Sequence, residues 1–307
     1  MKIIIEFFIF CLVLFLYLHI QFHLKTNNDL EIYEIDEPSK TNLDEICDIR
    51  QPVLFTANNT QIINHTKLDN IINNYGAFDI KIRNINDDTN NNTNEPTDLF
   101  ISLPLNSSVK LFNDETNHNY ISENNTDFLQ ETGIIKQMQN CDELFRPPMV
   151  SWCNYDILMG EENSITPFRY ELNYRMFVVV TQGSAQIKLS PHQSSKYLHT
   201  INDYENLEFK SPINPWDPQP KYVNDFNKIK CLEVTLTQEK TFFIPAYWWH
   251  SIKLDKNSSV SIFRYRTYMN TISILPQLSL RMLQLQNIKR NTINQINQIE
   301  KKNDIIT

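Results

Sequence analysis

Glycine is scarce in this chain: only 4 of its 307 residues are Gly. Phosphate-binding loops need closely spaced glycines, and neither the Walker A pattern nor the G-x-G-x-x-G pattern occurs. The chain also has no excess of basic residues, because 28 Lys and Arg stand against 36 Asp and Glu for a net charge of −8. Binding to nucleic-acid phosphates requires a basic face. We therefore expect neither a nucleotide-binding loop nor a nucleic-acid partner.

Cysteine pairs with the spacing of a zinc site are absent as well. The five cysteines are Cys11, Cys47, Cys141, Cys153 and Cys231, and none of them forms a C-x-x-C pair. Cys11 falls in the apolar N-terminus. The other four are compatible with two disulfides or with four buried free thiols, and the sequence does not choose between these alternatives.

The N-terminus contains the longest apolar run. From Ile3 to Leu18 nearly every residue is apolar, which approaches the roughly 20 residues that span a bilayer. A cleaved signal peptide is the competing interpretation, but no small-x-small cleavage site follows the run. We therefore predict a transmembrane anchor over residues 1–24 and a single-pass membrane protein. Lys2 precedes the run and acidic residues soon follow it, which favours the non-cytoplasmic side for the bulk of the chain.

Three further segments follow the predicted anchor. Residues 25–44 are polar and acidic and are predicted to form a tether. Over residues 45–270 short apolar runs alternate with turn residues, which is typical of a β-sandwich or barrel. Residues 271–307 place apolar side chains near a 3.6-residue spacing and are predicted to be helical. We favour docking of this helix on its own domain, with self-association as the alternative.

The β region is organised around residues 242–252. Pro245 ends the first apolar run because it fixes φ and has no N–H group. Trp248 and Trp249 then lead into His250, and strand alternation places His250 on the same face as Trp248. A histidine in an aromatic-walled β-pocket is a candidate metal ligand or general base. The simpler alternative is a core histidine that makes one hydrogen bond.

Four segments of the β region carry a family resemblance. They are residues 163–171 (NSITPFRYE), 177–183 (FVVVTQG), 214–218 (NPWDP) and 244–250 (IPAYWWH). In this order they resemble the cupin-like branch of the JmjC-type iron(II)/2-oxoglutarate oxygenases, most closely over 145–265. The resemblance implies a mainly β double-stranded β-helix (cupin or jelly-roll fold) with accessory helices and a pocket at its mouth. With the N-terminal run, the chain is also similar to membrane-anchored cupin-like proteins of large DNA viruses.

The resemblance implies an iron site made by two histidines and one carboxylate, with open positions for 2-oxoglutarate and dioxygen. By position, Arg169 replaces the first histidine, Glu171 replaces the aspartate, and only His250 is retained. Arginine has no lone pair to offer and repels a cation in a low-dielectric pocket. We therefore expect no metal at these vestigial positions. Instead we predict a salt-bridged cluster of the three residues in the vacated space.

The 2-oxoglutarate side of the implied pocket is altered too. The family usually places a lysine on the strand after the glycine turn, whereas this chain has 184–186 (Ser-Ala-Gln) there, with Lys188 as the nearest base. Thr166 keeps a hydroxyl where the family uses one. The residues predicted to line the pocket are Thr166, Tyr170, Lys188, Trp248 and Trp249.

These observations favour a membrane-anchored, non-catalytic cupin-like domain that binds or scaffolds a protein partner and needs no cofactor. Two alternatives stay open. One is an iron(II)/2-oxoglutarate-dependent protein hydroxylase with an unusual site. The other is a jelly roll that holds an anionic small ligand through Arg169. Titration with iron(II) and 2-oxoglutarate separates the non-catalytic domain from the hydroxylase.

Overall fold

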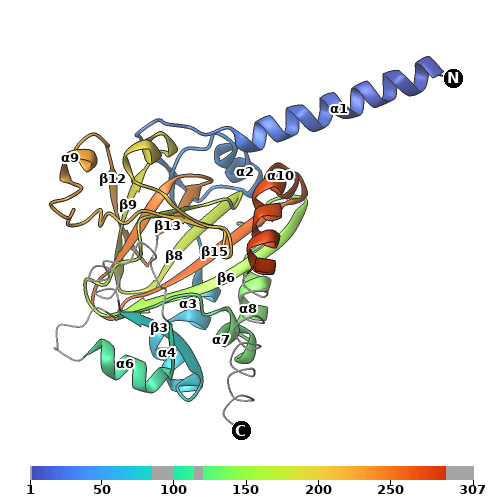
Figure 1. Ribbon diagram of the computed structural model, residues 1–307. Helices are drawn as coiled ribbons and strands as arrows, with labels where there is room; N and C mark the ends of the chain where they lie inside the picture. The colour runs from blue at the N-terminus through green and yellow to red at the C-terminus, as the bar shows by residue number, and fades with distance from the viewer. Residues whose placement is uncertain (1, 85–99, 114–119, 239, 288–307) are drawn as a thin grey trace, which may run out of the picture.

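The computed structural model describes residues 2–84, 100–113, 120–238 and 240–287, and two facing β-sheets form its body (Figure 1). The strands of the nine-stranded sheet, in spatial order, are β1 (Tyr33–Asp36), β2 (Val53–Thr56), β13 (Lys240–Pro245), β8 (Arg175–Gln182), β15 (Ser259–Thr267), β6 (Val150–Gly160), β5 (Tyr120–Ser122), β3 (Asp79–Asn84) and β4 (Ile101–Pro104). The strands of the six-stranded sheet are β10 (Ile201–Asp203), β11 (Glu208–Lys210), β7 (Arg169–Glu171), β14 (Trp249–Leu254), β9 (Ser184–Ser190) and β12 (Leu232–Thr237).

Alternate residues of the long strands fill the space between the two sheets. Val178 and Val180 of β8 pack there against Ile187 of β9 and Ile252 of β14, and all four are buried. Successive side chains of a strand point to opposite faces, so each strand contributes every second residue to this interior. Within each sheet, neighbouring strands run antiparallel, except that β1 and β2 are parallel. The predicted mainly β jelly-roll architecture is confirmed.

A second core lies on the outer face of the nine-stranded sheet, under helices (Figure 1). These helices are α2 (Lys40–Asp48), α3 (Thr60–Thr66), α4 (Leu68–Tyr75), α6 (Leu105–Phe112), α7 (Thr126–Glu131) and α8 (Ile134–Cys141). Phe145 stacks on Phe177 of β8 with 4.8 Å between ring centroids, and Phe55 and Phe263 meet this pair edge-on. Offset aromatic pairs of this kind add stability beyond the area they bury. The predicted accessory helices are present.

The segment predicted as a tether, residues 25–44, is instead partly built into the domain. Its strand β1 pairs in parallel with β2, in register from Tyr33 opposite Val53. Its last residues open α2, where the Ser39 hydroxyl accepts a hydrogen bond from the N–H of Asn42. Leu43 is fully buried in the outer core. The polar composition misled the prediction because a strand at a sheet edge and a helix with one apolar face expose most of their side chains.

The helix α1 (Lys2–Leu24) projects from the domain (Figure 1). Arg50 holds its last turn. Arg50 donates from Nη1 to the carbonyl oxygens of His23 at 3.1 Å and Lys25 at 3.3 Å. Its guanidinium lies 5.1 Å from the ring centroid of Phe22. A cation at the carboxyl end of a helix is favourable because the last carbonyl groups carry partial negative charge. Among the described residues, α1 is the one helix long and apolar enough to cross a membrane, although a signal sequence has the same character.

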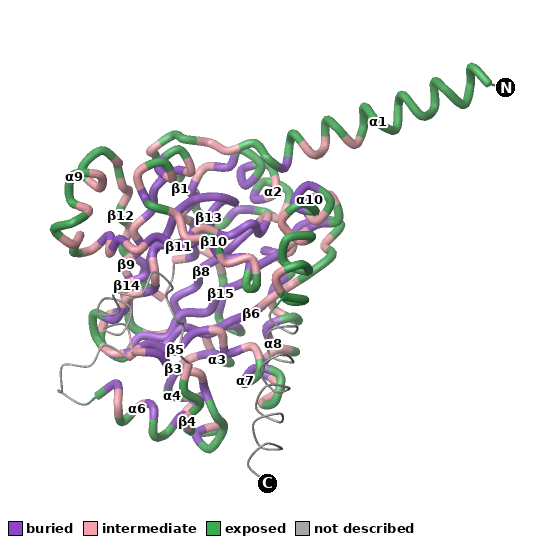
Figure 2. Tube along the Cα trace, in the orientation of Figure 1, coloured by how far each residue is buried: buried purple, intermediate pink, exposed green. Residues whose placement is uncertain are grey.

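The end of the described chain is helical. It forms α10 (Tyr268–Ser273), and a further helix covers 275–287. Ile274 is buried and Leu278 packs beside it, so the first turn of the later helix docks on the domain. Figure 2 shows that most of the tube after α10 is exposed. The predicted docking therefore holds for the start of this helix, and residues 288–307 lie outside the described residues.

The five cysteines, all in the described part of the chain, are free thiols. Cys47 is buried, Cys11 is exposed, and Cys141, Cys153 and Cys231 are partly exposed. The alternative of two disulfides is therefore not realised, and the other alternative holds only in part because one of the four thiols is fully buried.

Candidate functional site

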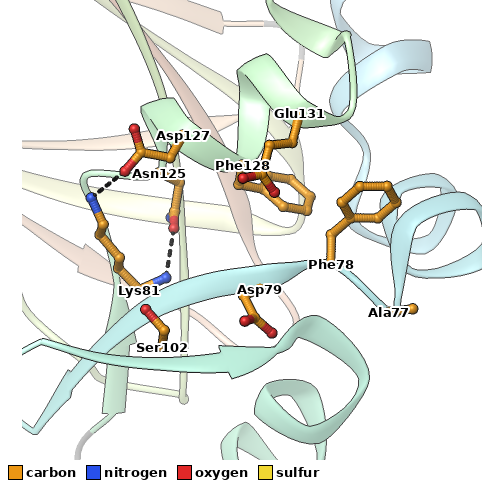
Figure 3. A pocket seen from close by; sticks show the side chains of 9 residues that line it. All are labelled: Ala77, Phe78, Asp79, Lys81, Ser102, Asn125, Asp127, Phe128 and Glu131. Carbon is orange, nitrogen blue, oxygen red and sulfur yellow. Dashed lines mark hydrogen bonds and ion pairs between the residues drawn. The ribbon is translucent and has the colours of Figure 1, made fainter.

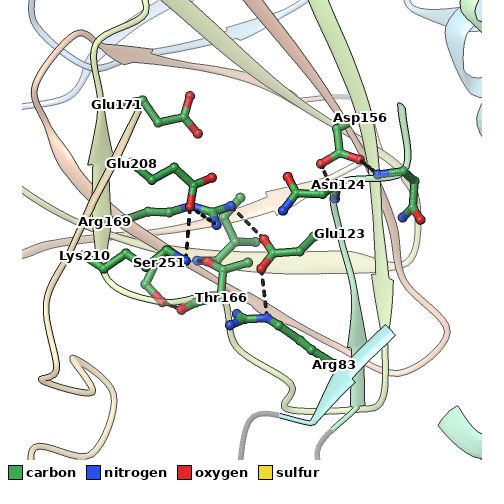
Figure 4. A network of polar contacts seen from close by, with 12 residues as sticks. Arg83, Glu123, Asn124, Asp156, Thr166, Arg169, Glu171, Glu208, Lys210 and Ser251 are labelled. Atoms are coloured by element: carbon green, nitrogen blue, oxygen red, sulfur yellow. Dashed lines mark hydrogen bonds and ion pairs between the residues drawn. The ribbon is translucent and has the colours of Figure 1, made fainter. Parts of the chain in front are cut away.

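The three vestigial positions lie on two paired strands and point into the space between the sheets. Two of them, Arg169 and Glu171, are seen in Figure 4. Arg169 of β7 stands directly opposite His250 of β14, so their side chains share a face. Trp248 and Ile252 belong to the interior core, which identifies this face as the inner one. Glu171, two residues after Arg169, lies on the same face. The exposed fractions of Arg169, Glu171 and His250 are 2%, 7% and 2%.

Arg169 is held by two buried carboxylates. Its Nη2 lies 2.7 Å from Glu123, directly after β5, and its Nη1 lies 3.4 Å from Glu208 of β11. Glu123 also pairs with Arg83 of β3 at 2.9 Å, and Glu208 pairs with Lys210 at 3.4 Å. The guanidinium is therefore neutralised from both sheets.

Glu171 has a different cationic partner. Nε of Arg264, on β15, lies 3.0 Å and 2.9 Å from its two carboxylate oxygens, and Asn173 donates a further hydrogen bond to it. Arg264 also lies 3.8 Å from Asp156 of β6, whose carboxylate accepts bonds from the N–H groups of residues 124 and 125. Figure 4 shows these carboxylates around one interior end of the fold.

The predicted three-residue cluster is thus replaced by a larger network. Arg169 and Glu171 have separate partners, and His250 makes no ion pair among the described residues. The cations of the network are Arg83, Arg169, Lys210 and Arg264. Its anions are Glu123, Asp156, Glu171 and Glu208. Since cations and anions are equal in number, the formal charges of this buried network cancel, as burial of charge requires.

The pKa shifts of the carboxylates follow their partners. Burial by itself raises the pKa of Glu123, but the charges of Arg169 and Arg83 outweigh it and lower that pKa to about 2. Burial also acts to raise the pKa of Glu171, but Arg264 and the neighbouring charges outweigh it and the pKa is lowered. Asp156 shows the opposite result: burial raises its pKa, and Arg264 at 3.8 Å offsets this only in part.

His250 is a buried neutral histidine. Its Nδ1 lies 3.2 Å from the carbonyl oxygen of Trp248, and a carbonyl only accepts, so the Nδ1 proton is donated there. Nε2 has no hydrogen-bond partner among the described residues. Burial lowers the pKa of His250 to about 4; Glu171 opposes this shift, and Arg169 adds to it. This single hydrogen bond matches the simpler alternative of a core histidine.

Comparison with known proteins agrees with the two-sheet fold. A family model described as a cupin-like domain matches residues 38–269, most of the chain.

The chain belongs to the cupin-like domain family.

Curated relatives of this cupin-like chain include HSPB1-associated protein 1 of Homo sapiens and of Bos taurus. Each is 29% identical over 105 residues, which cover 34% of this chain. The aligned part spans only 22% of the length of those relatives.

The residues of this cupin-like domain do not fit an iron(II) site. Within the described ranges, no group of three or more His, Cys, Asp and Glu side chains is placed to hold a metal ion. Arg169, the residue opposite His250, presents a cation already bound by two carboxylates. A divalent cation beside it meets repulsion and finds no third donor.

Three of the predicted pocket-lining residues lie outside the interior. On β9, Ile187 and Leu189 face inward, so Lys188 faces outward, where its Nζ lies 2.6 Å from Glu233 and 4.8 Å from the Trp216 ring centroid. The prediction for Lys188 is wrong for this reason.

Tyr170 and Trp249 also cover the outer face of the six-stranded sheet, under η1 (His192–Tyr197) and α9 (Val223–Phe226). Their rings lie 4.9 Å apart, and Trp249 packs 5.5 Å from Phe168. Trp248 does face the interior. The Thr166 hydroxyl accepts a hydrogen bond from the N–H of Ile252 at 2.9 Å, so it ties the preceding turn to β14.

A cavity of about 410 Å³ lies elsewhere, between β3 and α7 (Figure 3). Its lining residues are Ala77, Phe78, Asp79, Lys81, Ser102, Asn125, Asp127, Phe128 and Glu131. Lys81 is engaged by Asp127 at 2.7 Å, and its N–H donates to Asn125 Oδ1 at 3.0 Å. Sequence reasoning missed this cavity because its walls come from a strand and a helix that share no motif.

Proposed function

We propose that this chain is a membrane-anchored, non-catalytic cupin-like domain that binds or scaffolds a protein partner. The observation that carries the proposal is Arg169, whose guanidinium is paired with Glu123 and Glu208 at the position of a metal-binding histidine. An ion network of balanced charge in that place stabilises the fold but offers no open coordination position. No resident cofactor is expected.

The anchor is the apolar helix α1, which we place across a membrane with the domain on the non-cytoplasmic side. Arg50 ties its last turn to the domain through the carbonyl groups of His23 and Lys25. This support favours a retained helix, since a signal peptide that is cleaved away needs no such contact.

A protein-binding role is favoured by what the relatives' name says of those proteins, namely association with HSPB1. We take from this only the class of role, because the similarity covers 34% of this chain. Viral origin, suggested by the resemblance alone, remains part of the same proposal.

The test is a rebuilt metal site in the full chain. The double change Arg169→His with Glu171→Asp supplies two donors beside His250, the set that a facial iron site requires. We expect a rise in Tm with iron(II) or manganese(II) in this variant, corresponding to about 2.7 kcal/mol at a hundredfold excess over Kd. Wild type should show no rise.

The matched control adds His250→Gln to the double variant, which removes the third donor and should abolish the rise. Stoichiometric iron(II) binding and 2-oxoglutarate turnover by wild type would overturn the proposal. A folded double variant without any metal response would show that the three positions do not converge on one point.

An active hydroxylase with an unusual site is the second candidate. It is favoured by His250, whose Nε2 lone pair is buried without a partner among the described residues and near Glu171. The anionic-ligand alternative has less support, because both terminal nitrogens of Arg169 that would hold the ligand are engaged by carboxylates.

A further inference from the structure

Large apolar side chains that remain exposed gather around α10. They are Met149, Trp152, Tyr268, Ile272, Leu275, Leu280, Met282, Leu283 and Leu285, and we call this set the C-terminal apolar face. The N–H of Tyr268 donates to the carbonyl of Met149 at 3.1 Å, which joins the start of β6 to α10. Single exposed apolar residues are ordinary, whereas a contiguous set marks an interaction surface.

Apolar residues of the helix 275–287 remain exposed beyond its docked first turn. Leu275, Met282 and Leu283 are 57%, 67% and 57% exposed, while Leu278 packs against the domain. A surface helix of a water-soluble domain normally keeps its apolar stripe toward the core. Here the stripe that contains Leu278 continues past the domain, and the described part of the chain supplies no cover for it.

The C-terminal apolar face is continuous with α1. The helices α1 and α10 contact each other, and Figure 1 shows α10 on the side of the domain toward which α1 projects. Arg50 fixes the last turn of α1 to the domain. If α1 crosses a bilayer, this face therefore stands at the level where the bilayer begins.

The charges of the face suit a lipid surface. Residues 268–287 contain no Asp or Glu and one basic residue, Arg281, in a chain of net charge −8. Trp152 lies at the edge of the face with its ring centroid 4.2 Å from the guanidinium of Arg266. Tryptophan and arginine both combine an apolar body with a polar end, and such side chains are favoured at the membrane–water interface.

We propose that the C-terminal apolar face lies on the surface of the membrane that α1 spans, with the 275–287 helix as an interfacial contact. The inference rests on the proposed membrane anchor. A second copy of the chain or a soluble partner is a weaker occupant, because neither explains why the face adjoins the anchor and lacks acidic residues.

The experiment uses the full chain in vesicles of phosphatidylcholine, with and without bromine on the acyl chains. The variant Leu283→Trp places a new indole in the face. The control Val223→Trp replaces a residue that is 36% exposed, on α9, which lies on another side of the domain (Figure 1). The fluorescence emission spectrum of wild type is subtracted from that of each variant, which leaves the emission of the added Trp. We expect brominated lipid to remove about half or more of the emission added at 283, and to leave that added at 223 unchanged.

The outcomes separate the inference from the anchor. If the chain floats with vesicles but brominated lipid does not quench the emission of the Trp introduced at 283, the face does not touch lipid. The inference is then overturned, while the anchor stands. A bromine-insensitive blue shift at 283 indicates a protein cover instead and also overturns it. If the chain does not float with vesicles, the inference and the proposed anchor both fail.

Discussion

At the scale of single residues, Arg169 is the side chain on which the proposed function rests. A cationic side chain that is 2% exposed is tolerated only because Glu123 and Glu208 neutralise it. In the proposed function, these ion pairs occupy the position at which a cupin-like oxygenase would bind metal. Neutralisation of the buried charge and the proposed absence of a metal both rest on this residue.

We expect Arg169→Met to lower the free energy of unfolding by about 3–5 kcal/mol, because it leaves buried carboxylates short of a partner. Urea unfolding at pH 7 measures the loss. The matched control is Lys81→Met, which breaks the exposed pair with Asp127 and should cost about 1 kcal/mol or less. Equal losses in the two variants would show that the interior network does not stabilise the fold.

His250 should make stability depend on pH. Its pKa is about 4 in the folded chain against an ordinary 6.5, so between these values the unfolded chain binds more protons. Stability contributed by this group is complete above pH 6.5 and falls by about 3 kcal/mol as the pH drops to 4.

Urea unfolding at pH 7 and at pH 5 tests this dependence. His250→Gln should reduce the difference between the two pH values, whereas His65→Gln, at an exposed position with no ion pair among the described residues, should leave it as in wild type. An unchanged difference in His250→Gln would mean that this histidine is already protonated in the fold or is open to water.

At the scale of elements, β1 and α2 decide how the domain meets its anchor. β1 extends the nine-stranded sheet beside β2, and α2 places Leu43 and Ile46 in the outer core. Arg175, which is 2% exposed, pairs with Asp44 and Asp48 of α2. The segment that connects α1 to the sheets is therefore packed against the domain through β1 and α2.

We expect Leu43→Ala to destabilise the domain by about 2–5 kcal/mol, because it leaves a cavity under α2. Glu45→Ala, on the exposed side of the same helix, should change stability by about 0.5 kcal/mol or less. Thermal or urea unfolding of the full chain in detergent measures both. Similar stabilities for the two variants would restore the tether interpretation for this segment.

At the scale of the whole molecule, α1 and the C-terminal apolar face hold most of the large apolar side chains that are exposed among the described residues. Both lie on one side of the domain (Figure 2). The cavity between β3 and α7 lies at the end of the domain away from α1 (Figure 1).

We expect the full chain to stay with membranes after extraction at alkaline pH, and deletion of Lys2–Leu24 to release it, since an interfacial helix alone binds reversibly. Sedimentation followed by immunodetection measures the distribution. Mass spectrometry of the mature N-terminus is the control for cleavage. A mature chain that starts after Leu24 would show that α1 is a signal sequence.

Patterns that are local in the sequence were enough to predict part of the fold. The apolar run identified α1, and short apolar segments between turns indicated the two-sheet fold. Alternation correctly placed His250 with Trp248. The same alternation also predicts the direction of Lys188. Ala185, Ile187 and Leu189 are apolar and face inward, so Lys188, which alternates with them, faces outward. These features depend on residues close together in the chain.

The ion network was decided only by the tertiary structure. Glu123 and Glu208 lie 46 and 39 residues from Arg169, and they reach it because β5 and β11 converge on the same end of the interior. Arg264 likewise forms an ion pair with Glu171 across the interior. Strand order and register set these pairings, and neither can be read from the spacing of charges along the chain. A buried charge takes whichever partners the fold brings within reach, because leaving it unpaired costs more than any local preference.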